Sequence, residues 1–283
     1  TVASAFTGSV VFNIKNADGS LSEIPARPAA GDYVITMSGL ENKGAKNYDP
    51  IVFVDGSLHV DKRDVIVVVD EGQKKVYGEA DPALTWTATG DGAYYVSEDA
   101  GDLANLKVVR PDAGTDAGED VGKHPMIIEG DDANFNITRV NNTFEITPAT
   151  LNVTLAPQSK IYGDENPVLS GDDLIFDGFV VKPVKGNTTP DDAGVLSIAN
   201  LTFNFTDAEG APATVASHAG TGKVVPANVE NAAANNYTFV YAPVDFVIDK
   251  RPITVTAKPQ TSIYGDDVAV EDWSDYGTVN VLE

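Results

Sequence analysis

A tyrosine-glycine motif that occurs three times constrains this 283-residue chain more than any other feature. The copies are Val76-Tyr77-Gly78-Glu79-Ala80-Asp81-Pro82, Ile161-Tyr162-Gly163-Asp164-Glu165-Asn166-Pro167 and Ile263-Tyr264-Gly265-Asp266-Asp267. The three tyrosines are 85 and 102 residues apart, and each interval is the length of one small domain. Internal similarity at such a period predicts a series of similar structural units rather than one large domain.

Each motif follows a run of β-branched residues of strand length, whereas helical periodicity is nearly absent. The runs are residues 65–69, 151–155 and 253–257. Clusters of Gly, Pro, Asn and Asp separate such runs at intervals of about 8–12 residues, which is typical of an all-β sandwich. Two clusters, ending at Gly19 and Gly210, are predicted hairpin turns, because glycine adopts the positive φ that such turns need.

The end of each unit repeats as well. An Asn-aromatic pair opens a stretch that we expect to be hairpin-like, at Asn47-Tyr48, Asn134-Phe135 and Asn236-Tyr237. Each stretch closes on an apolar strand that runs into the next unit without a Gly/Ser linker, so the units should be stiffly joined. The predicted organisation is the C-terminal part of a unit (1–62), two whole units (63–147 and 148–250) and the N-terminal part of a unit (251–283).

Together these motifs resemble the MBG, or YGX-type, bacterial immunoglobulin-like repeat. That family's pattern is a first strand, a Tyr-Gly-Asp-x-x-Pro turn, a Gly-x-Tyr-x-Ile-x-x-Ser-Gly stretch, an Asn-Tyr pair and an apolar strand that ends in Lys. Residues 162–167 match the turn, residues 31–39 match the later stretch and Asn47-Tyr48 matches the pair. The third turn departs from the pattern, because Ala269 replaces its proline. The resemblance implies tandem immunoglobulin-like β-sandwich domains in an extracellular adhesin of the cell surface.

The two partial units are complementary, since their combined length of 95 residues lies between the two spacings. One interpretation is a fragment of a longer repeat protein. In the other, the C-terminal part of one copy completes the N-terminal part of the next, which builds a head-to-tail filament by strand complementation. A first residue that is neither Met nor a tag remnant slightly favours a natural mature subunit. Both interpretations stay open at this point.

Composition excludes several classes of function. The chain has 42 acidic and 19 basic residues, and a net charge of −23 argues against nucleic-acid binding. It has no Cys, and its longest apolar runs of about five residues are too short to span a membrane. The three histidines, His59, His124 and His218, have neither metal-ligand nor catalytic spacing, and no nucleophile elbow occurs. We therefore expect no enzyme and no catalytic residue.

The clustered acids permit a calcium interpretation, because loops rich in Asp can supply the six to eight oxygens that calcium takes. The alternative is that acidity keeps an extracellular polymer soluble and self-repelling. We therefore expect no cofactor, with calcium as the competing interpretation. A Lys-Asn or Lys-Asp isopeptide bond at Lys62 or Lys250 is a further covalent alternative. The acidic clusters are Asp112, Asp116, Glu119 and Asp120, the pairs Asp131-Asp132, Asp172-Asp173 and Asp191-Asp192, and Asp266-Asp267 with Glu271-Asp272.

The repeated residues have a structural interpretation. The glycine takes a positive φ, the acid accepts backbone N–H bonds and the tyrosine packs its ring against the sheet. A tryptophan follows the first and third tyrosines by nine residues, and we interpret both as core residues rather than carbohydrate platforms. The structural motif comprises Tyr77, Gly78, Trp86, Tyr162, Gly163, Tyr264, Gly265 and Trp273.

These observations favour a structural or adhesive function, as a subunit or stalk segment of an extracellular bacterial adhesin or filament. Stacked small domains with short junctions give length and stiffness without catalysis. The expected partners are copies of the chain or neighbouring repeats. Two alternatives remain: a module that binds a glycan or protein through aromatic residues and loops, and an accessory region of an enzyme whose catalytic domain lies elsewhere.

Overall fold

The computed structural model describes residues 6–15, 18–43, 50–93, 103–259, 261–267 and 277–281. The chain divides into two compact units. Unit 1 comprises Thr1–Lys74, Asp81–Ala113 and Lys123–Glu145, and unit 2 comprises Lys75–Ala80, Gly114–Gly122 and Ile146–Glu283. Unit 2 therefore contains the first Tyr-Gly turn as well as the whole of the repeat that follows it.

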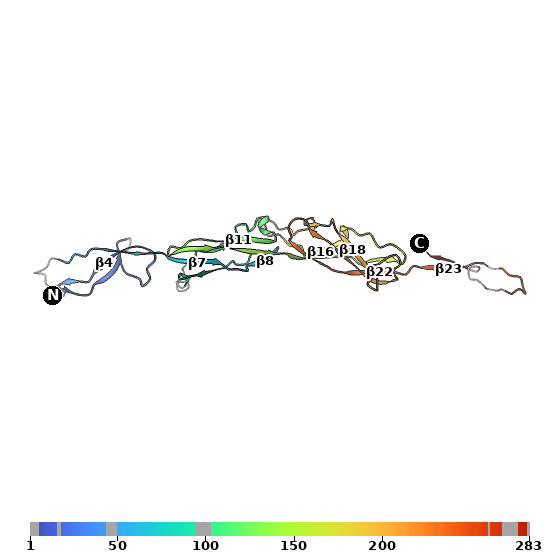
Figure 1. The fold of residues 1–283 in the computed structure, drawn as a ribbon, viewed down its shortest axis with the longest axis horizontal. Coiled ribbons are helices and arrows are strands. Elements are labelled where there is room, and N and C mark those ends of the chain that lie inside the picture. Colours follow the sequence, from blue (N-terminus) through green and yellow to red (C-terminus); the bar gives the residue numbers. More distant parts are fainter. Residues whose placement is uncertain are drawn as a thin grey trace. The chain divides into compact units, whose positions relative to one another are not determined.

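The predicted all-β fold is confirmed, and the first thirteen strands form four sheets (Figure 1). The sheet orders are β1-β5, β3-β2-β4-β6, β12-β7-β9 and β10-β11-β13-β8. In the last of these sheets, the C-terminal ends of β8 and β13 belong to unit 2. The strands are β1 (Phe6–Thr7), β2 (Val11–Lys15), β3 (Leu21–Glu23), β4 (Gly31–Ser38), β5 (Glu41–Asn42), β6 (Gly56–Val60), β7 (Arg63–Val69), β8 (Lys74–Val76), β9 (Trp86–Thr89), β10 (Lys107–Val109), β11 (Gly122–Glu129), β12 (Phe135–Val140) and β13 (Asn142–Thr147).

Unit 2 contains four further sheets, with the orders β16-β14-β21, β15-β22-β19-β18, β17-β20 and β23-β24. Three short 3-10 helices, η2 (Ala117–Glu119), η3 (Gly171–Asp173) and η4 (Ala193–Val195), lie in its connections. The strands are β14 (Ala149–Leu155), β15 (Gln158–Ile161), β16 (Leu174–Asp177), β17 (Leu196–Ser197), β18 (Thr202–Thr206), β19 (Gly220–Ala227), β20 (Glu230–Asn231), β21 (Tyr237–Tyr241), β22 (Val244–Asp249), β23 (Ile253–Ala257) and β24 (Gly277–Val281).

The first strand after each of the first two junctions is central in a three-stranded sheet. Strand β7 pairs in parallel with β12 and antiparallel with β9. Strand β14 pairs in the same way with β21 and β16. Because successive side chains of a strand point to opposite faces, only alternate residues of these strands reach the core. Val65, Val67 and Val69 are buried in one sheet, and the corresponding core residues of the other are Leu151, Val153 and Leu155.

One expectation about the closing stretches is wrong. The Asn-aromatic pairs do not open hairpins at Asn134-Phe135 and Asn236-Tyr237, because the two strands that follow each pair belong to different sheets. Strand β12 pairs with β7, whereas β13 lies in the sheet of β11 and β8. Strands β21 and β22 are divided in the same manner. The third pair, Asn47-Tyr48, lies outside the described residues.

The predicted turns at Gly19 and Gly210 are confirmed. Strands β2 and β3 are antiparallel neighbours, and Gly19 between them has φ +83°. Gly210 has φ +82° in the turn that brings Thr206 opposite Pro212. Among the described residues, no helix is long and apolar enough to cross a membrane.

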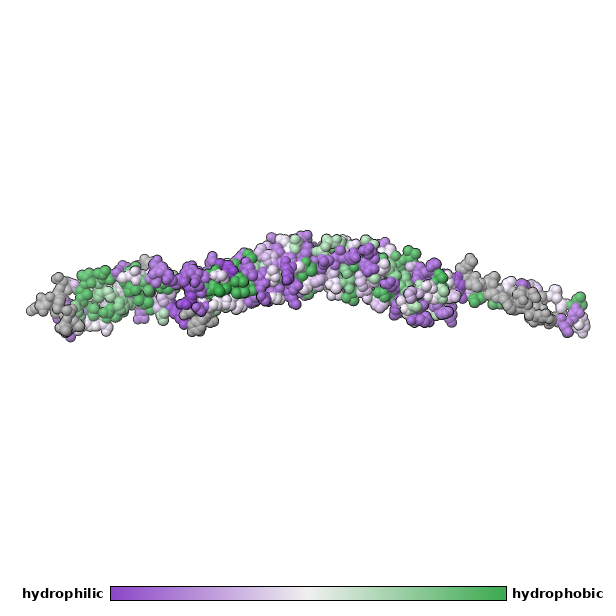
Figure 2. Space-filling model, viewed as in Figure 1, coloured by the Kyte–Doolittle hydropathy of each residue, from purple (hydrophilic) through white to green (hydrophobic). Residues whose placement is uncertain are grey.

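The strands nearest the two termini leave apolar side chains exposed. In β23, Ile253 and Val255 are 62% and 69% exposed. Phe12 of β2 and Val34 of β4 are also exposed, and Figure 2 shows apolar residues gathered on the visible face of this N-terminal sheet. Exposed apolar strands of this kind are typical interaction surfaces.

Candidate functional site: the Tyr-Gly turns

The first turn explains why its motif needs glycine. Gly78 has φ +88°, and a Cβ atom there would lie 2.4 Å from a methyl group of Val180. Any larger residue would therefore be both strained and obstructed. The carboxylate of Glu79 accepts a hydrogen bond of 3.0 Å from the backbone N–H of Val76, as expected for the acid of the motif.

Tyr77 belongs to a buried aromatic cluster in unit 2. Its side chain is only 2% exposed, and its ring meets that of Tyr237 edge to face, with centroids 5.5 Å apart. Both hydroxyl groups donate to the same oxygen of Asp191, over 2.7 and 2.8 Å. Burial raises the pKa of both phenols, and the hydrogen bonds to Asp191 raise it further. Two neutral hydroxyl donors thus stabilise one carboxylate within an otherwise apolar contact.

Charged side chains surround this cluster. Lys182 forms ion pairs with Asp116 and Asp120, over 2.9 and 2.6 Å. Lys75 contacts Glu119, and these two side chains are 2% and 3% exposed. Ion pairs that are this well buried lose much more when one partner is removed than surface pairs do. Lys75, which precedes the first turn, is therefore held within unit 2 by charge as well as by packing.

Asn236 of the Asn-aromatic pair ties these residues to the second repeat. Its side-chain oxygen accepts a hydrogen bond of 2.9 Å from the backbone N–H of Val121, and its amide donates to Asp120 over 2.9 Å. In unit 1, the side-chain oxygen of Asn134 accepts a similar bond of 3.0 Å from the backbone N–H of Ala30. From the sequence, these asparagines were predicted only to open the closing stretch of each unit.

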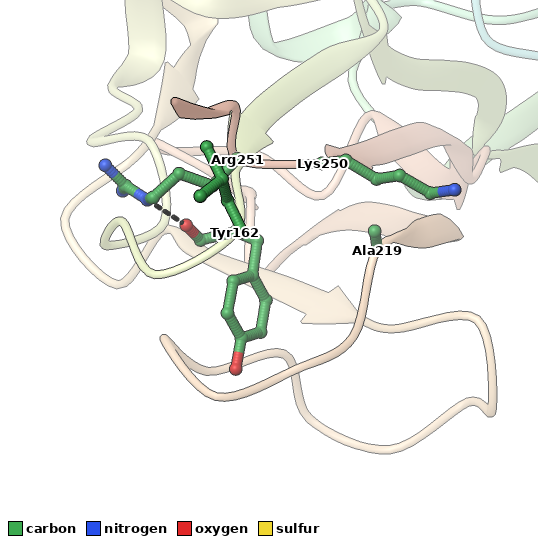
Figure 3. A pocket seen from close by; sticks show the side chains of 5 residues that line it. Tyr162, Ala219, Lys250 and Arg251 are labelled. Carbon is green, nitrogen blue, oxygen red and sulfur yellow. Dashed lines mark hydrogen bonds between the residues drawn. The ribbon is translucent and has the colours of Figure 1, made fainter. Parts of the chain in front are cut away.

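The second turn has the same backbone and a different environment. Gly163 has φ +92°, but Tyr162 is 41% exposed. Beside it lies a cavity of about 380 Å³ lined by Tyr162, Ala219, Lys250, Arg251 and Ile253 (Figure 3). The side chain of Arg251 donates to the backbone oxygen of Tyr162 over 2.6 Å. The guanidinium of Arg251 also pairs with Asp164, so the second tyrosine borders an open and mainly apolar pocket.

The third turn is the most exposed of the three. Gly265 has φ +98°, and Tyr264 is fully exposed. The expected packing of the tyrosine ring thus occurs at Tyr77 and not at Tyr162 or Tyr264. Trp86 is partly buried at the start of β9, opposite Val69, and Trp273 lies outside the described residues.

Several of the acids that suggested calcium have other partners in the structure. Asp191 accepts hydrogen bonds from Tyr77 and Tyr237. Asp173 caps η3 and Asp192 caps η4. Asp131 pairs with Arg139 over 2.6 Å. Across the described part of the chain, no group of three or more His, Asp or Glu side chains is arranged to hold a metal ion. Glu271 and Asp272 lie outside that part, and calcium binding stays a prediction.

The two lysines that suggested isopeptide bonds have different surroundings, and such a bond stays a prediction. The ammonium of Lys62 donates to the backbone oxygen of Asp132 over 3.3 Å, at an exposed position. Lys250 lines the pocket beside Tyr162.

Two of the solved structures that match the chain are distantly similar to it. The chain resembles Drosophila N-cadherin EC1-4 at 9% sequence identity and a TM-score of 0.27, over 87% of this chain and 67% of that one. It resembles Sidekick-1 immunoglobulin domains 1-5 at 12% identity and a TM-score of 0.19, over 89% of this chain and 55% of that one. These TM-scores are too low to support a structural or functional argument. No curated protein sequence matches the chain significantly.

The sequence comparison with protein families is informative. Residues 65–145 match the model of the MBG domain of YGX type, which is the family that the repeated motifs predicted. The matched range includes the first Tyr-Gly turn and the first Asn-aromatic pair after it. Residues 65–145 are thus similar to the MBG domain of YGX type.

Proposed function

We propose that this chain is a structural segment of an extracellular bacterial adhesin or filament, in which serial β-sandwich repeats act as a stiff spacer. The observation that carries the proposal is the Tyr77-Asp191-Tyr237 cluster. Through it, the turn of one repeat becomes part of the packed interior of the compact unit that contains the next. A spacer needs such joints, because a flexible linker would let neighbouring domains swing independently.

The chain connection supports the same function. One residue, Pro148, separates β13 from β14, and two residues separate β6 from β7. Side-chain contacts then add to this short connection, since Asn236 bonds to Val121 and Asp120 within unit 2. Covalent continuity together with buried polar contacts resists bending better than either alone.

We propose in addition that copies associate head to tail through their partial units. The exposed apolar residues of β23 support this part of the proposal, because the equivalent residues of β14 are buried core. A second copy or a following repeat would remove this apolar surface from water. Cell-surface location and a role without catalysis belong to the same proposal, and the matched MBG domain supports both.

Negative-stain electron microscopy of the purified chain tests the spacer function. Wild-type particles should be straight rods of uniform length. The Tyr77→Ala variant should give rods that bend near the first turn, whereas Tyr264→Ala, at a fully exposed position, should look like wild type. Wild-type particles that bend freely at that position would refute the spacer function. A glycan array distinguishes the alternative of a ligand-binding module, for which we expect no binding.

A further inference from the structure

The two described Asn-aromatic pairs bond to the preceding repeat in the same way. Asn134 accepts from the backbone N–H of Ala30 over 3.0 Å, and Asn236 accepts from that of Val121 over 2.9 Å. Ala30 directly precedes β4, and Val121 directly precedes β11. Each is thus the last residue before a long strand that begins with glycine. This contact recurs at equivalent positions of two successive repeats.

A second bond accompanies the first in both places. The backbone oxygen of Asn134 accepts from the N–H of Arg63 over 2.9 Å, and that of Asn236 accepts from the N–H of Ala149 over 3.0 Å. These bonds start the parallel pairing of β12 with β7 and of β21 with β14. One asparagine therefore receives two backbone donors, one from each of two different strands.

The pocket beside Tyr162 presents the same two positions. Ala219 directly precedes β19, which also begins with glycine, and it corresponds to Val121. Arg251 lies two residues before Ile253, as Ala149 lies two residues before Leu151. Both line the pocket together with Tyr162, which is the counterpart of Tyr77 (Figure 3).

We propose that this pocket, lined by Tyr162, Ala219 and Arg251, is the docking site for Asn47-Tyr48 of a second copy of this chain. Asn47 supplies the acceptor oxygens for the backbone N–H groups of Ala219 and Arg251, and Tyr48 packs its ring against Tyr162. The proposal rests on the structural function proposed above, and it identifies the contact residues of the head-to-tail association.

Three observations favour this occupant. The buried pair of Tyr77 and Tyr237 is a template for two tyrosines in contact at such a turn. The cavity of about 380 Å³ lies within the range of pockets that enclose organic groups of this size. Lys250 lines it beside Arg251, whose guanidinium already pairs with Asp164, and an acid, Asp49, follows Tyr48. Shape, chemistry and charge thus agree with the same segment.

Sedimentation velocity of the 283-residue chain over a concentration series tests the proposal. The wild-type average sedimentation coefficient should rise with concentration. Tyr162→Ala and Asn47→Ala should each weaken association by about tenfold or more, the loss expected for one good contact. Asn47→Asp should retain association, because its carboxylate keeps the acceptor oxygen. Val168→Ala is the control, since that side chain is fully exposed in the same repeat as Tyr162 but does not line the pocket.

Each contrary result has a distinct meaning. A wild-type chain that stays monomeric at every concentration, or a Tyr162→Ala chain that associates as wild type does, would overturn the docking site. Equal weakening by Val168→Ala would also overturn it, because the effect would then not be specific to the pocket. A monomer that is a straight rod in micrographs refutes the docking site and the head-to-tail association but leaves the spacer function standing. A freely bending monomer refutes the spacer function as well.

Discussion

Replacing Tyr77 and Tyr162 in parallel separates a buried joint from an open one. The Tyr77→Ala change removes a ring that is 2% exposed, together with its edge-to-face contact with Tyr237. Truncation of a fully buried aromatic residue costs about 3–5 kcal/mol of unfolding free energy. The same change at Tyr162, which is 41% exposed, should cost about 1 kcal/mol, a fraction of the value for full burial.

Urea unfolding followed by circular dichroism measures the difference. With a slope of about 2 kcal/mol per molar urea for a small domain, Tyr77→Ala should lower the midpoint of the unit 2 transition by about 2 M. Tyr162→Ala should lower it by about 0.5 M on the same scale. Equal shifts for the two variants would refute the assignment of Tyr77 to a joint. The transition is analysed by unit, because a chain of several domains need not unfold in two states.

The Tyr77→Phe variant isolates the hydroxyl group. A hydrogen bond to a charged partner contributes about 1.5–3 kcal/mol, and the lower end applies because Tyr237 continues to donate to Asp191. The pKa of Tyr77 is raised in the folded state, so this phenol contributes full stability below its unfolded pKa of about 10. That contribution is lost as pH rises above about 10. Alkaline unfolding of Tyr77→Phe should therefore depend less steeply on pH than that of wild type.

Three further predictions concern charge. Lys75→Met should lower the unfolding free energy by about 3–5 kcal/mol, because it removes the ammonium group that pairs with the buried Glu119. The double variant Lys75→Met/Glu119→Leu should recover most of this loss. Full stability of the single variant would contradict the burial of this pair. The hydrogen bond to Asp32 raises the pKa of His59. Protonated His59 therefore stabilises the fold below a pH of about 6.5, and this stabilisation is lost as pH rises through the raised pKa. Asp32→Ala should lower the pKa of His59 in an NMR titration, and an unchanged value would refute the contact. A calcium chelator should leave the melting temperature unchanged, since most of the described clustered acids pair within the protein; a large decrease would instead establish a calcium site.

The strands and the turns were predictable from local sequence. The run of β-branched residues at 65–69 predicted a strand, and the structure confirms it as part of β7, with Val65, Val67 and Val69 buried. Gly78 and Gly163 were predicted to adopt positive φ, and both do. These features depend on neighbouring residues only, so a single sequence contains the information that they need.

The partners of the buried polar residues were not predictable. Asp191 was one of a pair of acids that suggested calcium, yet it accepts hydrogen bonds from Tyr77, 114 residues away, and from Tyr237. The predicted hairpins after the Asn-aromatic pairs were wrong for the same reason, because strand pairing also depends on residues that are distant in the sequence. Two apolar runs separated by one residue look alike whether they fold back on each other or cross between sheets, and the decisive factor is the parallel pairing of β12 with the distant β7.

A double-mutant cycle between Tyr77 and Tyr237 tests the central claim most directly. If the turn of the first repeat and the strand of the second form one joint, the two truncations to Ala must not be additive. The ring pair predicts a coupling of about 0.5–1.5 kcal/mol in the unfolding free energy, and the shared Asp191 should increase it. Additive effects, within about 0.3 kcal/mol of zero coupling, would contradict the account.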